Sequence, residues 1–176
     1  MMPSSGAHAP HRNGLALLNL SDVNITIGLR TTMTIAPDFR EFAACLNACE
    51  VRYLIVGGYA VAFHGHPRYT KDLDVWIERT RENVQRLLRA LEDFGSVGLE
   101  EADFLEPDQI IQLGYPPLRI DILTSLAGVE FEACYGARET VTVEQVALSF
   151  IGLEDLRTNK HASGRHQDLA DLENLD

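Results

Sequence analysis

The sequence predicts one α+β domain, a mixed β-sheet flanked by helices and closed by C-terminal helices, over residues 37–176. Short apolar segments rich in β-branched residues alternate with segments of helical periodicity. Two strand segments are separated only by Pro116-Pro117, a turn that favours neighbouring strands. Hairpin-like strands of this kind argue against a long, doubly wound sheet. A chain of 176 residues suffices for one domain with its own core.

Residues 1–36 are expected to form an N-terminal extension that is partly disordered. Residues 1–14 are polar, small and turn-rich, which predicts disorder. Residues 15–33 have some strand character. Because Met33 directly precedes the first segment with clear globular patterning, it is a second candidate for the first residue of the native protein.

The first half of the domain is expected to alternate helices and strands. Apolar residues at helical spacing, such as Phe42 and Leu46, predict the first helix, and a β-branched run that ends at a glycine pair predicts the next strand. The best-defined helix begins after Thr80, with Asn83 three residues later, and ends at Gly95. The expected elements are a helix (residues 37–50), a strand (51–56), a short helix (59–65), a strand (72–78) and a helix (80–95).

The second half is expected to hold the remaining strands and the closing helices. Two of its strands are separated by Pro116-Pro117, and two helices close the chain. The expected elements are two strands (residues 108–115 and 118–125), a short helix (128–138), a strand-like segment (139–152) and two helices (153–162 and 164–175).

The composition limits the partners and the location of the protein. An apolar fraction of 45% and a charged fraction of 23% are those of an ordinary globular protein. A net charge of −11 works against a broad grip on nucleic-acid phosphates, although nucleic acid stays open as a local substrate. No apolar run approaches the roughly 18 residues that span a membrane. Three cysteines without a CxxC pair indicate neither a disulfide framework nor a zinc site, and they fit the reducing cytoplasm.

Three carboxylates stand at unusual places in the predicted strands. Asp72 and Asp74 are two residues apart in a strand, so both point to the same face. Asp121 lies among apolar residues of a later strand, where an unpaired acid is costly to bury. If the two strands are neighbours, the three acids converge and form a site for a hard divalent cation such as Mg²⁺ or Mn²⁺. The alternative is that Asp72 and Asp74 are solvated at a strand end and Asp121 caps a turn.

The glycine pair Gly57-Gly58 lies where a strand gives way to a short helix. Glycine permits positive φ and lets the backbone approach a ligand closely, so a triphosphate is a candidate ligand. The alternative is a tight turn without a ligand. Neither a GxGxxG nor a GxxxxGK[ST] pattern is present, so dinucleotide-binding and Walker-type sites lack support.

The segment YLIVGGYAVAFHGHPRYTKDLDVWIE resembles the nucleotidyltransferases of the DNA polymerase β superfamily, in particular the small bacterial abortive-infection and toxin–antitoxin nucleotidyltransferases. In that family a glycine turn follows a strand, an acid–hydrophobic–acid strand comes next, and a third acid lies on a later strand. Gly57 and Gly58 match the turn, Asp72 and Asp74 the acid pair, and Asp121 the third acid. The resemblance covers roughly residues 37–175 and implies the nucleotidyltransferase fold.

The resemblance also implies an activity. A metal-dependent enzyme of this kind moves a nucleoside monophosphate from an NTP to an acceptor hydroxyl and releases pyrophosphate. Asp72, Asp74 and Asp121 would hold Mg²⁺ or Mn²⁺, Asp121 would help to activate the acceptor, and Gly57 and Gly58 would contact the triphosphate. The acceptor stays open between an RNA end, a protein and a small molecule. The alternative is a non-catalytic component of a toxin–antitoxin-type system that senses nucleotides or binds a protein partner.

Further nucleotide contacts are expected from Arg68, Thr70 and Lys160. Arg68 and Thr70 immediately precede the acid pair, and their alternative role is that of solvated loop residues that shape the strand entry. Lys160 is a candidate cation for the triphosphate. Its alternative role is an ion pair with Asp168 or Asp171 in the closing helices.

Overall fold

Two β-sheets hold the strands of the protein in a computed structural model that describes residues 23–27, 31–70, 72–115 and 118–175. The strands of the larger sheet are β3 (Tyr53–Ile55), β4 (Asp72–Ile77), β5 (Ile110–Leu113), β6 (Arg119–Leu123), β7 (Glu139–Val143) and β8 (Val146–Phe150). Their order is β5-β6-β4-β3-β8-β7. β4 pairs with β6, and β3 with β8, in parallel, while the other pairs are antiparallel. The sheet is therefore mixed, which confirms the predicted class.

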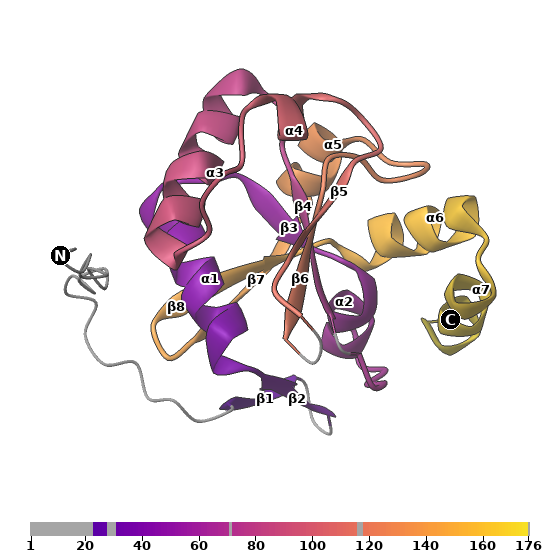
Figure 1. The fold of residues 1–176 in the computed structure, drawn as a ribbon. Helices are drawn as coiled ribbons and strands as arrows, with labels where there is room; N and C mark the ends of the chain where they lie inside the picture. Colours follow the sequence, from indigo (N-terminus) through magenta and orange to yellow (C-terminus); the bar gives the residue numbers. More distant parts are fainter. Residues whose placement is uncertain (1–22, 28–30, 71, 116–117, 176) are drawn as a thin grey trace, which may run out of the picture.

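Helices cover both faces of this sheet. They are α1 (Pro37–Ala48), α2 (Gly57–Phe63), α3 (Arg81–Phe94), α4 (Ala102–Leu105), α5 (Phe131–Gly136), α6 (Leu153–Ser163) and α7 (His166–Leu175). Figure 1 shows α1 and α3 together on one side of the sheet and the C-terminal helices α6 and α7 on the other. The two predicted closing helices are thus confirmed as α6 and α7. In Figure 1, α2 is drawn between them and the sheet.

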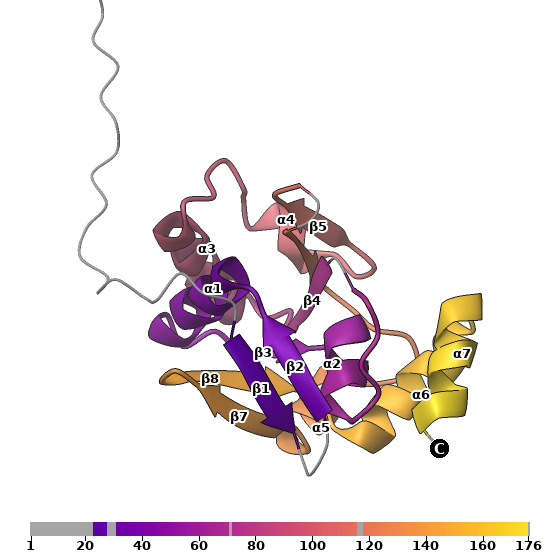
Figure 2. The same cartoon turned by 90° about the horizontal axis from the view of Figure 1, so that it is seen from below.

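A small hairpin precedes the domain. β1 (Val23–Ile27) and β2 (Thr31–Ile35) form a separate antiparallel sheet, and β2 leads directly into α1, as Figure 2 shows. Met33 lies inside β2 and pairs with Ile25. The disorder predicted for residues 1–14 lies outside the described residues.

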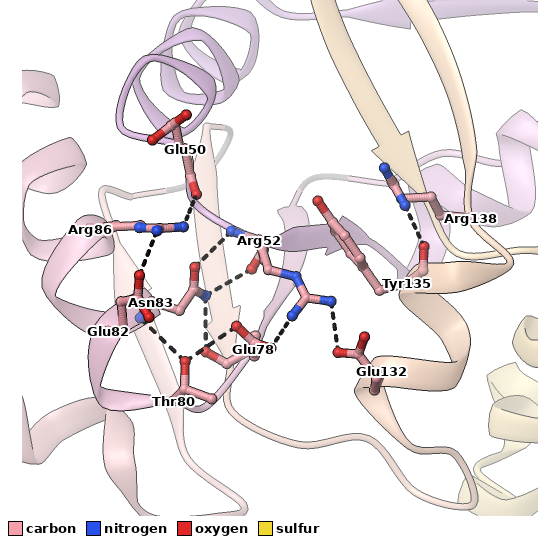
Figure 3. A network of polar contacts seen from close by, with 10 residues as sticks. All are labelled: Glu50, Arg52, Glu78, Thr80, Glu82, Asn83, Arg86, Glu132, Tyr135 and Arg138. Carbon is pink, nitrogen blue, oxygen red and sulfur yellow. Dashed lines mark hydrogen bonds and ion pairs between the residues drawn. The ribbon is translucent and has the colours of Figure 1, made fainter.

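Helix α3 is fixed to the sheet by its own N-terminus. Thr80 Oγ1 accepts a hydrogen bond from the Asn83 N–H, and Gly95 ends the helix with φ of 95°, as the sequence predicts. The Asn83 amide is buried and donates to the carbonyl oxygens of Arg52 and Glu78, at 2.9 Å each, while its oxygen accepts from the Arg52 N–H at 2.7 Å (Figure 3). A single amide therefore ties α3 to the ends of β3 and β4.

Two features of the second half differ from the prediction. The segment expected as one strand-like run is the hairpin β7–β8, because Glu144 and Gln145 both have positive φ (46° and 72°), as a two-residue hairpin turn requires. Helix α4 is one short turn around the buried Phe104 and has no periodic pattern that could predict it.

The interior of the domain lies between the sheet and its helices. Leu54, Ile77, Leu87 and Ile122 are fully buried there. The three cysteines are free thiols. Within the described ranges, no helix combines the length and the apolar character needed to cross a membrane.

Candidate active site

The predicted carboxylates come together because β4 and β6 are parallel neighbours. Their register sets Asp74 opposite Asp121 and Asp72 opposite Arg119. Neighbouring strands lie about 4.8 Å apart, and alternate residues share a face. All three carboxylates therefore project from one face of two adjacent strands.

Arg119 was not predicted as a site residue, and its guanidinium lies between two of the acids. Its Nη2 donates to Asp72 Oδ2 at 2.7 Å and to Asp121 Oδ2 at 3.0 Å, and its Nε lies 2.9 Å from Asp121 Oδ1 without hydrogen-bond geometry. The signal in the sequence is a basic residue two positions before Asp121, on the same strand face. Arg119 thus supplies a positive charge inside the acid cluster.

The cluster still carries an excess of negative charge. Burial, together with the charges of Asp121 and Asp72, raises the pKa of Asp74 to about 6, although Lys160 opposes the shift. Burial also raises the pKa of Asp121, against the effect of Arg119. A carboxylate that protonates this readily is one for which a further cation would be favourable.

The chemistry of the three acids suits a hard divalent cation, but their present arrangement does not. Among the described residues, no three histidine, cysteine or acidic side chains are arranged to hold a metal ion. Asp72 and Asp121 turn toward Arg119 instead, while Asp72 Oδ1 is buried and accepts no hydrogen bond within the described part of the chain. A metal at this position would therefore replace the guanidinium of Arg119 as the counter-charge.

The two glycines are required for different steric reasons. Gly57 has φ of +60°, and a Cβ there would lie 2.0 Å from Asp74 Oδ2. A Cβ on Gly58 would lie 2.8 Å from Thr70 Oγ1 and 3.3 Å from Arg68 Cζ. Real Cβ atoms essentially never make contacts under 3.0 Å, so glycine at position 57 lets this backbone lie against the acid strand, and glycine at position 58 lets it lie against Thr70.

Arg68 and Lys160 converge on one carboxylate. Lys160 is buried, and its Nζ lies 2.8 Å from Asp171 Oδ2 and 2.7 Å from Asp168 Oδ1. Arg68 donates to both oxygens of Asp171, at 2.8 and 3.2 Å. The ion pairs named as the alternative role of Lys160 are therefore present. They join the loop before β4 to both C-terminal helices.

A pocket of about 460 Å³ opens between the sheet, the start of α2 and helix α6. Five predicted residues line the pocket: Gly57, Gly58, Arg68, Asp74 and Lys160. Three other predicted residues lie next to residues of this site. Thr70 contacts the backbone at Gly58, Asp121 is paired with Asp74 in the neighbouring strand, and Asp72 is hydrogen-bonded to Arg119.

Asp74→Asn is expected to stabilise the metal-free protein at neutral pH. The raised pKa of Asp74 means that the folded state binds more protons than the unfolded state between about pH 4 and pH 6. Stability from this group is therefore lost as the pH rises through that window, by at most about 3 kcal/mol. Urea denaturation with EDTA should show a gain for the variant at pH 8 that disappears at pH 4. An equal effect at both values would contradict the assignment.

A glycine-lined turn facing acids on two adjacent strands of a mixed sheet defines a nucleotidyltransferase-type domain. The chain belongs to the family described as nucleotidyltransferase of unknown function (DUF6036), whose model matches residues 39–176. This match confirms the resemblance to nucleotidyltransferases.

Among solved structures, the chain is similar to an antigenic nucleotidyltransferase-like protein from Paracoccidioides brasiliensis. The two chains are 18% identical, with a TM-score of 0.49, over 77% of this chain and 72% of the other. No curated protein matches the chain.

Proposed function

We propose that the protein is a Mg²⁺- or Mn²⁺-dependent nucleotidyltransferase that moves a nucleoside monophosphate from an NTP to an acceptor hydroxyl. The observation that carries the proposal is one pocket that joins Asp74, with Asp121 directly opposite, to Gly57 and Gly58. Membership of a nucleotidyltransferase family supports it. The acceptor is an RNA end, a protein or a small molecule.

The residues of the pocket divide the work of the reaction. Arg68, Lys160 and Arg165 line the pocket, and a triphosphate would share the charge of the first two with Asp168 and Asp171. A divalent ion held by Asp72, Asp74 and Asp121 would stabilise negative charge on the phosphoryl oxygens. The acceptor oxygen bonds to the α-phosphorus while the bond to the bridging oxygen breaks, and pyrophosphate leaves with that electron pair. The hydroxyl proton passes to a carboxylate of the Asp74–Asp121 pair.

The test is a transfer assay with each α-labelled NTP, Mg²⁺ or Mn²⁺, and cell extract as the source of acceptors. Transfer by the wild type should fall at least about 10³-fold in Asp74→Asn and in Asp121→Asn, because each removes charge at the reacting centre. Asp38→Asn, on the exposed start of α1, is the matched control and should keep full activity. No labelled product with any NTP, or equal transfer by the site variants, would remove the enzyme proposal.

A second candidate is a nucleotide-binding component without catalysis, such as a member of a toxin–antitoxin-type system that acts through a protein partner. The position of Arg119 favours it, because a guanidinium between Asp72 and Asp121 already neutralises part of the acid cluster. Wild-type protein that binds nucleotides but transfers no label would support this candidate over the first.

Arg119→Gln should separate the two candidates further. Without the guanidinium, the metal-free variant should lose about 1–3 kcal/mol, because two partly buried carboxylates lose their partner. Mn²⁺ should then raise its Tm more than it raises that of the wild type, since the ion no longer competes with Arg119. Arg81→Gln, at an exposed ion pair, is the control. A Mn²⁺ shift no larger than in the wild type would show that Arg119 does not occupy the metal position.

A further inference from the structure

The end of the pocket remote from the glycine pair has a different chemistry from the phosphate end. Antiparallel pairing of β5 and β6 sets Ile110 opposite Leu123, on the same strand face as Asp121. Asp108, just before β5, and Ser125, just after β6, line the pocket beyond them. Ser125 is four residues from Asp121, which corresponds to about 13 Å along an extended strand. The pocket is thus long enough to separate a phosphate end from a second, carboxylate-bearing end.

The carboxylate of Asp108 is held in place by its neighbours. The Asp108 N–H donates to Ser125 Oγ at 2.9 Å, and the Ser125 hydroxyl donates back to Asp108 Oδ1 at 2.5 Å. The next residue is fixed as well, since the Gln109 N–H donates to Thr124 Oγ1 at 3.0 Å. Asp108 has φ of +58°, a conformation that aspartate tolerates better than most residues, and its hydrogen bonds with Ser125 accompany it. Within the described residues, Oδ2 of this carboxylate takes part in no hydrogen bond that would compete with a ligand.

Asp108 and Ser125 offer a ligand hydrogen-bond acceptors, beside the amide of Gln109, which also lines the pocket. The Ser125 hydroxyl already donates its hydrogen bond to Asp108 Oδ1. Asp108 Oδ2 and the second lone pair of Ser125 Oγ therefore remain as acceptors for a ligand. The cations Arg68 and Lys160 meet at Asp171 beside Gly58, so the triphosphate belongs at that end and not next to Asp108. The apolar side chains of Ile110 and Leu123 between the two ends suit the flat face of a nucleobase.

We propose that Asp108 selects the NTP by its base and favours adenine and cytosine, whose exocyclic amino groups (N6 and N4) stand where guanine and uracil carry a carbonyl oxygen. An amino group donates a hydrogen bond to Asp108 Oδ2. Guanine and uracil present a carbonyl oxygen at the corresponding position, so two hydrogen-bond acceptors would face each other there. This inference rests on the proposed function, because it assumes that an NTP occupies the pocket.

The test is titration of the full chain, with Mg²⁺ present, by the α,β-methylene analogues of ATP, CTP, GTP and UTP, which resist transfer. The wild type should bind the ATP or the CTP analogue about tenfold or more tightly than the GTP and UTP analogues. Asp108→Asn should reduce this ratio to near one and tighten UTP binding, because an amide can donate to a carbonyl oxygen. Glu106→Gln removes a charge two residues away, at a side chain outside the pocket lining, and should leave the ratio unchanged.

The outcomes separate this inference from the proposed function. Wild-type protein that binds all four analogues equally would overturn the role of Asp108 and leave the nucleotide pocket intact. If Asp108→Asn and Glu106→Gln change the ratio of affinities equally, the role of Asp108 is also overturned, because the effect would then come from the lost charge alone. Wild-type protein that binds none of the four analogues would overturn the proposed function itself.

Discussion

Gly57→Ala is expected to lower the free energy of unfolding by about 3 kcal/mol or more and to abolish nucleotide binding. The new methyl group would lie 2.0 Å from Asp74 Oδ2 and 2.7 Å from Asp74 Cγ, so the acid strand or the turn must move. The positive φ of +60° adds about 1 kcal/mol for a residue with a Cβ. Both effects act at the junction of the glycine turn and the carboxylates.

Two other glycines separate these contributions. Gly95 also has positive φ, but a Cβ there meets no atom within 4 Å, so Gly95→Ala measures the backbone cost alone. Gly136 has neither constraint, and Gly136→Ala should be neutral or slightly stabilising. Urea denaturation of the three variants gives the comparison. If Gly57→Ala lowers the free energy of unfolding no more than Gly95→Ala does, the close approach to Asp74 does not contribute to the cost of the substitution.

A double-mutant cycle locates the clash. In the Asp74→Ala background the nearest remaining atom to the new methyl group is the Cβ at position 74, at 3.1 Å, so most of the steric cost of Gly57→Ala should disappear. Additive effects of the two substitutions would place the damage elsewhere in the turn.

Local patterns in the sequence predicted those parts of the fold that depend on neighbouring residues. Thr80 and Gly95 bound α3 because capping and positive φ are properties of a few consecutive residues. The convergence of Asp121 with Asp74 was predicted only under the condition that their strands are neighbours, and the register fulfils it.

The features that the sequence did not predict depend on contacts between distant residues. Arg119 acquires its role from register, since it is paired with Asp72, 47 positions away. Asp171 was considered only as a partner for nearby cations of the closing helices, yet it also binds Arg68 across 103 positions. Asp108 becomes part of the pocket only through the pairing of β5 with β6. No periodicity or motif encodes such pairings.

Asp171→Asn is expected to cost about 3 kcal/mol or more of stability at neutral pH. Asp171 is 2% exposed and accepts hydrogen bonds from both Lys160 and Arg68. A neutral amide at this position would remove the negative charge that the two cations share. Burial opposes the ionised form, but the hydrogen bonds from Lys160 and Arg68 dominate and lower its pKa. The contribution of Asp171 is therefore fully present above its ordinary pKa and is lost as the pH falls below about 4.

Asp168→Asn is the matched control, because Asp168 pairs with Lys160 and lies outside the bidentate contact with Arg68. Asp168→Asn should lower the free energy of unfolding less than Asp171→Asn does. Urea denaturation at pH 7 and pH 3.5 should show that this difference between the two variants is smaller at pH 3.5. A further variant, Lys160→Met, decides the role of Lys160. If its ion pairs only hold α6 against α7, NTP affinity per folded molecule should survive Lys160→Met, whereas a cation that binds the triphosphate should lose about tenfold or more in affinity.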